Sequence, residues 1–204
     1  MQQRAERTRQ AILQAARKLF AAGGFAGTSV DSIAEAASAN KQRIYAYFGS
    51  KKKLFEAVLL DIFAENAETF AAFARQYCGC PDRNITFELS RYYFELHLSK
   101  PEFRRLLSWA NLENAIDPEI LSRAREQENQ QLQRWFKQGQ ETGALRQDIT
   151  FESWLLTVMG TAYFASSNAM TLSKSLGKDF LAPQALERAG NDLAALFAPQ
   201  SSAK

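Results

Sequence analysis

The chain has 204 residues, of which 46% are hydrophobic, and only 10 glycines and 5 prolines interrupt a composition rich in helix formers. This composition allows a sizeable core, favours an all-α fold and argues against a sheet-rich one. No apolar run approaches the roughly 18 residues that a membrane-spanning helix needs, and the first ten residues lack the apolar core of a secretory signal. We therefore expect a soluble, cytoplasmic protein.

The formal net charge of +3 is unevenly distributed along the chain. Residues 1–60 contain 10 basic and 4 acidic side chains, whereas residues 61–204 contain 15 and 18. A basic end is the expected electrostatic footprint of a protein that binds a polyanion. Basic N-termini also arise by chance, so this charge alone does not identify a partner.

The first predicted helix covers residues 8–22 and carries one apolar stripe, after which Gly23-Gly24 ends it. Residues 28–31 (Thr-Ser-Val-Asp) predict the start of a short second helix, with a hydroxyl cap and an acid three residues on. Ser38-Ala39 makes a tight connection. Asn40 is a good N-cap for a third helix, in which Ile44 and Phe48 face inward and which Gly49 ends.

The rest of the chain also has helical periodicity. Further helices are predicted at residues 51–77, 84–98, 101–115, 118–142, 151–175 and 183–197. This gives about nine helices in total, with no internal repeat. We expect a helix-turn-helix domain in residues 1–50 and a helical ligand-binding and dimerisation domain in residues 51–204, connected by helix 51–77.

Two short helices joined by a tight turn and braced by a third are typical of a helix-turn-helix, whose second helix enters the major groove of DNA. Here that helix leaves Lys41, Gln42, Arg43, Tyr45 and Tyr47 on the outside. Gln pairs bidentately with adenine, and Arg or Lys with guanine, while Tyr and Asn contact phosphates. The alternative for the two tyrosines is partial burial with the hydroxyl in water.

Lys51, Lys52 and Lys53 stand at a helix start, where cations oppose the helix dipole. A phosphate in front of that helix would be attracted by both the dipole and the lysines. The alternative is a solvated lysine cluster.

Residues 9–60 resemble the N-terminal domain of the TetR/AcrR regulators. The matching motifs are A-x-x-L-F (16–20), G-F-x-G-T-S-V (24–30), I-A-E-A-A (33–37), I-Y-x-Y-F (44–48) and G-S-K-x-x-L-F (49–55). The resemblance implies a three-helix DNA-binding domain followed by a helical body that binds an inducer and pairs through its last two long helices.

By position, the resemblance implies that one set of residues contacts the DNA backbone, namely Thr28, Asn40, Tyr45, Tyr47 and Lys51. It implies that Lys41, Gln42 and Arg43 face the bases. The sequence departs from the family pattern at the turn, where Ser38-Ala39 replaces Gly and a branched residue, and at Gln42 and Ala46. These departures leave the operator sequence open.

Residues 151–172 are apolar nearly all round, and residues 183–197 offer a second apolar face. A helix that is apolar on most sides must be covered, and an isologous four-helix contact with a second copy would cover it. We therefore expect a homodimer through residues 151–175 and 183–197. Burial within one chain is the alternative.

Aromatic residues are abundant between residues 87 and 164, and ligand pockets favour aromatic side chains with a few polar anchors. The alternative is that most of these aromatics are core. The candidate ligand-binding residues are Tyr93, His97, Phe103, Trp109, Glu113, Trp154, Tyr163 and Asn168.

We expect no cofactor, no metal site and no catalytic residue. His97 is the only histidine, and Cys78 and Cys80 alone would leave a metal site incomplete, while a disulfide across one residue is strained. An enzyme would need a nucleophile–base pair, a metal set or a phosphate loop, none of which is found.

The sequence therefore predicts a repressor that binds a palindromic operator as a dimer and is released by a small-molecule effector. The alternative is a DNA-binding regulator without a small-molecule ligand, which is architectural or regulated by a protein.

Overall fold

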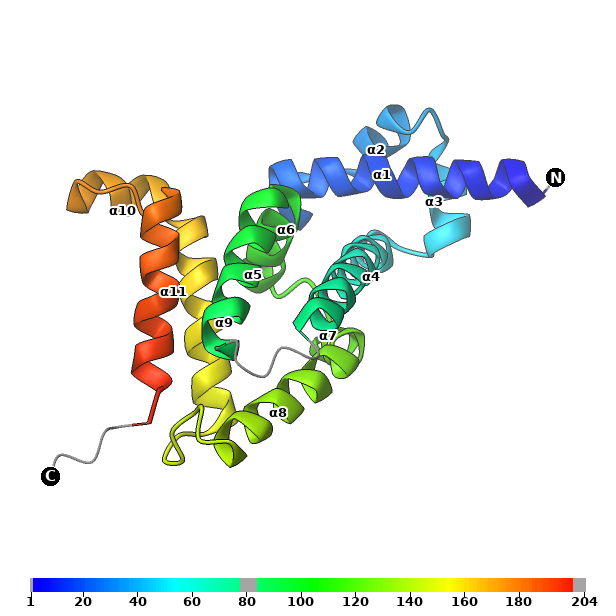
Figure 1. Cartoon of the computed structure of the whole chain (residues 1–204). Coiled ribbons are helices and arrows are strands. Elements are labelled where there is room, and N and C mark those ends of the chain that lie inside the picture. The colour runs from blue at the N-terminus through cyan, green and yellow to red at the C-terminus, as the bar shows by residue number, and fades with distance from the viewer. Residues whose placement is uncertain (1, 78–83, 200–204) are drawn as a thin grey trace, which may run out of the picture. The chain divides into compact units, whose positions relative to one another are not determined.

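A computed structural model describes residues 2–77 and 84–199 of the chain, so Cys78 and Cys80 lie outside the described residues. Every regular element in this part of the chain is a helix, which confirms the all-α prediction (Figure 1). No helix among the described residues is long and apolar enough to span a bilayer. The helices are α1 (Gln2–Gly27), α2 (Val30–Ala36), α3 (Lys41–Phe48), α4 (Lys51–Tyr77), α5 (Ile85–Ser99), α6 (Pro101–Glu113), α7 (Pro118–Ala124), α8 (Glu126–Glu141), α9 (Phe151–Ser167), α10 (Ala169–Leu176) and α11 (Pro183–Phe197).

Two predicted helices are each divided in two, which is why the described residues form 11 helices where the sequence predicted about nine. The helix predicted at 118–142 is interrupted at Arg125 (φ −107°, ψ 3°), a residue with no helix-breaking character. The helix predicted at 151–175 is interrupted at Asn168, whose side-chain amide donates to the carbonyl of Phe164 (3.0 Å). Asparagine competes in this way for backbone hydrogen bonds, which explains the second break.

The first helix is longer than the predicted range 8–22. α1 begins at Gln2, in a polar segment without an apolar stripe, so the periodicity could not reveal its start. Its backbone leaves helical geometry at Gly24 (φ 74°, ψ −179°), where the sequence predicted the helix to end.

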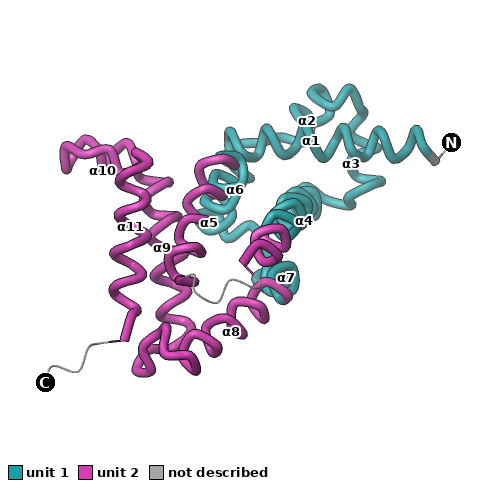
Figure 2. Tube along the Cα trace, viewed as in Figure 1, with its two compact units in different colours: residues 1–69, 101–126 teal, residues 70–100, 127–204 magenta. Residues whose placement is uncertain are grey.

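The chain forms two compact units (Figure 2). Unit 1 comprises residues 1–69 and 101–126, and unit 2 comprises residues 70–100 and 127–204. The division into domains at residue 50 stays a prediction.

Unit 1 is built around α1, which packs against α2, α3 and α6. The core contains Ile12, Phe20, Ile33 and Ile44, all with no exposed surface. Phe20 meets the ring of Phe55 of α4 edge-on, with centroids 5.0 Å apart. This core fixes α3 on the body of the unit.

Unit 2 is built around α5, which packs against both α9 and α11. Trp154 of α9 is fully buried there, and its indole N–H donates to the hydroxyl of Thr86 on α5 (3.0 Å). At the contact with α11, a Cβ on Gly190 would lie 3.0 Å from the ring of Phe87, so the glycine allows this close approach.

Candidate nucleic-acid interface

The first helix of the predicted helix-turn-helix, α2, is capped one residue later than the hydroxyl cap that the sequence predicted at Thr28. Ser29 is the N-cap of α2, and its hydroxyl accepts the N–H of Ser32 (2.9 Å). Thr28 is instead buried, and its hydroxyl donates to the carbonyl of Gly24 (2.8 Å). The Thr28 hydroxyl therefore ties the end of α1 to the start of α2.

The turn between α2 and α3 closes through a left-handed residue. Ser38 has φ 48°, its N–H donates to Glu35 (3.1 Å), and the N–H of Ala39 donates to Ala34 (2.9 Å). This pair of bonds is the Schellman arrangement, in which glycine is the usual left-handed residue. The turn therefore has the expected geometry without the glycine.

The residues that the sequence predicted to begin and end α3 do so in the structure. The side-chain oxygen of Asn40 accepts the N–H of Arg43 (2.8 Å), and Gly49 ends the helix with φ 77°. Ile44 and Phe48 are buried against the rest of unit 1. Their burial turns the opposite face of α3 to solvent.

The exposed face of α3 presents three groups of side chains. With 3.6 residues per turn, Ala46 lies opposite the buried stripe, Arg43 and Tyr47 lie on one flank, and Lys41, Gln42 and Tyr45 lie on the other. Gln42 and Arg43 are exposed, Tyr45 is 44% exposed, and Tyr47 is half-buried. The face thus carries the donors and acceptors that base edges and phosphates require.

Lys41 has a partner that the sequence analysis did not identify. Its Nζ lies 3.0 Å from Oδ2 of Asp31 on α2. The hydrogen bond and the charge of Asp31 raise the pKa of Lys41. The two residues are ten positions apart, and only the geometry of the turn brings them together.

Further cations lie at the N-terminus of α4. The hydroxyl of Ser50 accepts the N–H of Lys53 (3.1 Å), as expected of a cap. The Nζ of Lys51 lies 4.4 Å from the ring centroid of Phe25. Lys52 and Lys53 are exposed. The chain therefore places positive charge next to α3.

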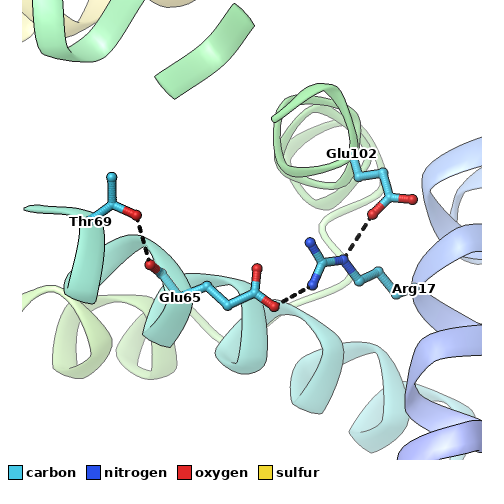
Figure 3. A network of polar contacts seen from close by, with 4 residues as sticks. All are labelled: Arg17, Glu65, Thr69 and Glu102. Atoms are coloured by element: carbon cyan, nitrogen blue, oxygen red, sulfur yellow. Dashed lines mark hydrogen bonds and ion pairs between the residues drawn. The ribbon is translucent and has the colours of Figure 1, made fainter. Parts of the chain in front are cut away.

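An ion-pair network braces α1 inside unit 1 (Figure 3). The guanidinium of Arg17 contacts Glu65 of α4 (2.6 Å) and Glu102 of α6 (2.9 Å). Burial disfavours the charged guanidinium, but the hydrogen bonds and charges of the two glutamates outweigh it and raise the pKa of Arg17. Arg17 therefore links three helices of the unit.

Three of the predicted ligand-binding residues lie in unit 1 and contact other helices there. The Glu113 carboxylate accepts the N–H of Ala26 (3.0 Å), and Trp109 lies against Gly24. Phe103 is buried and meets Phe63 edge-on, at 5.4 Å between centroids.

The other five lie in unit 2. The hydroxyl of Tyr93 donates to Glu128 (2.8 Å), and the ring of His97 lies 5.4 Å from that of Tyr163. Trp154 and Asn168 make the hydrogen bonds to Thr86 and Phe164 described above. A surface groove of about 320 Å³ in unit 2 is lined by a different set, Gly143, Leu145, Arg146, Gln147, Asp148 and Pro199. Whether the eight predicted residues contact a ligand stays a prediction.

Two protein-family models match this chain, one near its N-terminus and one over most of the remainder. Residues 12–58 match the model of the family described as bacterial regulatory proteins, tetR family, and residues 81–194 match that of a tetracyclin repressor-like C-terminal domain. The chain is 33% identical over 186 residues to the HTH-type transcriptional repressor NicS of Pseudomonas putida, covering 90% of this chain and 87% of the relative.

Solved structures show the same fold. A TetR family transcription regulator from Marinobacter aquaeolei has a TM-score of 0.69 at 22% identity, covering 98% of this chain and 100% of that one. The transcriptional regulator FadR from Bacillus subtilis, in complex with stearoyl-CoA, has a TM-score of 0.66 at 16% identity, covering 92% and 96%.

Proposed function

The chain belongs to the TetR family of DNA-binding transcriptional regulators, and on that premise we propose that it is a repressor that binds a palindromic operator as a homodimer and is released by a small-molecule effector. The observation that carries the proposal is the exposed face of α3. Its inner residues Ile44 and Phe48 are buried in unit 1. Their packing fixes the orientation of α3, so that Gln42 and Arg43 face solvent.

The proposed roles of the outward residues follow from their chemistry. Lys41, Gln42 and Arg43 have the donors and acceptors that read base edges in the major groove. Tyr45, Tyr47, Asn40 and Lys51 contact phosphates beside it. The buried hydroxyl of Thr28 contributes by holding the start of α2. It could donate to a phosphate only by giving up its hydrogen bond to the carbonyl of Gly24.

The homodimer is supported by apolar residues that unit 2 leaves exposed. Leu156 and Phe164 of α9 are 74% and 57% exposed, and Leu196 of α11 is 56% exposed. Leu156, Gly160 and Phe164 follow one another at intervals of four residues on one stripe of α9. A second copy that covers this stripe would link two recognition helices in one molecule, as binding to the two half-sites of a palindrome requires.

Release by an effector is the expectation that fits the family, and the solved FadR complex shows that a protein of this fold holds a small organic molecule. The alternative is a regulator without a small-molecule ligand. The indole N–H of Trp154 and the hydroxyl of Tyr93 are both bonded within the protein, so a ligand that accepts from them would have to displace Thr86 or Glu128.

The DNA-binding proposal is tested with the purified chain and duplexes from the region upstream of its own gene. We expect tighter binding to that region than to a scrambled duplex at physiological salt. Gln42→Ala and Arg43→Ala should each weaken specific binding by about 1–3 kcal/mol. Arg105→Ala, which removes an exposed cation on α6, is the matched control for Arg43 and should bind like the wild type.

The effector proposal is tested by a thermal-shift screen of the same protein against a library of small metabolites. A compound that stabilises the protein and lowers its affinity for the upstream duplex supports release by an effector. A screen in which no compound does both would favour the alternative regulator.

A further inference from the structure

The ion pair between Asp31 and Lys41 lies on the surface that the proposed function assigns to DNA. Nζ of Lys41 and Oδ2 of Asp31 are 3.0 Å apart, and the two side chains are 49% and 73% exposed. Water screens the charges of a pair this exposed, so the pair contributes little to folding. Its place on α3 points to a role in binding.

The number of hydrogen-bond donors on Lys41 indicates what the pair could bind. A lysine ammonium has three N–H donors and no acceptor. Asp31 accepts one of them, and two remain. Guanine presents two acceptors, N7 and O6, at the edge of the major groove. The ammonium held by Asp31 therefore keeps the donors that a guanine edge needs.

The pair also restricts a flexible side chain before DNA binds. Fixing a long side chain at an interface costs conformational entropy. Because Asp31 already restricts Lys41 in the free protein, Lys41 loses less conformational entropy when DNA binds. Arg43, on the other flank of α3, has no carboxylate within 4 Å among the described residues. Asp31 thus acts on one flank of the recognition helix and not on the other.

We propose that Asp31 is a positioning residue that holds Lys41 for a guanine in each half-site of the operator. The inference rests on the proposed function, because it needs α3 to lie in the major groove. Asp31 has a second effect: its negative charge repels the phosphates of any duplex, so it lowers the affinity for operator and unrelated DNA alike. Only the positioning of Lys41 raises selectivity for the operator.

The test compares base preferences measured by selection from a pool of random duplexes. The purified full-length wild type is compared with Lys41→Met, Asp31→Asn and Asp31→Glu. Glu35→Gln is the matched control, because Glu35 lies one turn further along the same exposed face of α2 and the substitution removes the same charge. Affinities for the selected duplex and a scrambled one are then measured.

We expect Lys41→Met to lower the preference for guanine at one position of each half-site by about 5- to 150-fold. Asp31→Asn should weaken the preference at that same position by about 2- to 12-fold and tighten binding to the scrambled duplex. Asp31→Glu keeps the carboxylate and should retain most of the preference. Glu35→Gln should change both affinities by the same factor and leave every preference in place.

The inference is overturned if Lys41→Met leaves all base preferences intact, or if Asp31→Asn keeps the preference that Lys41→Met removes. It is also overturned if Glu35→Gln weakens that preference as much as Asp31→Asn does. These outcomes differ from a failure of the proposed function, in which the wild type itself enriches no sequence from the pool.

Discussion

Gly24 lies directly against Trp109: a Cβ built on this glycine would be 2.8 Å from two atoms of the indole ring. The backbone of Gly24 has φ 74° and ψ −179°, a conformation that is nearly restricted to glycine. The contact joins the end of α1 to α6, next to the bond between Ala26 and Glu113. Glycine is needed at this position for two reasons, because the backbone conformation is rare and because the indole ring approaches too closely for a Cβ.

Gly24→Ala should therefore lower the free energy of unfolding by about 2–5 kcal/mol, from backbone strain and overpacking together. Chemical denaturation of the purified protein measures the loss. Gly27→Ala is the control, because a Cβ there meets no atom within 4 Å and should change stability by less than about 0.5 kcal/mol. Equal effects of the two substitutions would refute the role given to the contact with Trp109.

Arg17 offers a second test of how unit 1 is held together. Arg17→Met removes both ion pairs of a largely buried guanidinium, and we expect a loss of about 1–2 kcal/mol, limited by the exposure of Glu65 and Glu102. Glu65→Gln and Glu102→Gln should each cost less, because Arg17 keeps one partner. A double-mutant cycle measures each coupling, and couplings near zero would contradict the bracing role.

The sequence was sufficient for the local features of the recognition helix. Asn40 and Gly49 are recognisable caps, and the spacing of Ile44 and Phe48 is enough to orient α3. These features depend on residues within about one turn of each other, so no tertiary information was needed.

Contacts between distant residues could not be predicted in this way. The pairing of Lys41 with Asp31 depends on the path of the turn, and the approach of Trp109 to Gly24 depends on how α6 packs on α1. The hydrogen bond from the indole N–H of Trp154 to Thr86 joins residues that are far apart in the sequence. Residue type alone does not distinguish these environments. The break at Arg125 has no sequence signal, whereas Asn168 belongs to a residue type that competes for backbone hydrogen bonds inside helices.

The turn before α3 gives a prediction in the stabilising direction. Ser38 occupies the left-handed region at φ 48°, which costs a residue with a Cβ about 1–2 kcal/mol. Ser38→Gly removes this strain but adds freedom to the unfolded chain, so we expect a net gain of about 0.5–1 kcal/mol in the free energy of unfolding. Thermal denaturation measures it, with Ser38→Ala, which keeps the Cβ, as the control. A glycine variant no more stable than the alanine variant would show that the strain is absent.

The exposed stripe of α9 gives the sharpest test of the proposed homodimer. Leu156 of α9 and Leu112 of α6 are both 74% exposed in the single chain, so Leu156→Glu and Leu112→Glu are matched changes. A charge buried at an interface without a partner is strongly unfavourable, whereas a charge on a free surface is not. We therefore expect Leu156→Glu to sediment as a monomer and Leu112→Glu to sediment as a dimer in analytical ultracentrifugation.

The same pair of variants also separates dimerisation from folding. Neither side chain contributes to the core, so both variants should keep the wild-type helical content by circular dichroism. Because a palindrome is bound by two linked recognition helices, the monomeric Leu156→Glu protein should lose most of its operator affinity while α3 itself is unchanged. A Leu156→Glu protein that remains dimeric would place the interface away from the stripe of Leu156, Gly160 and Phe164.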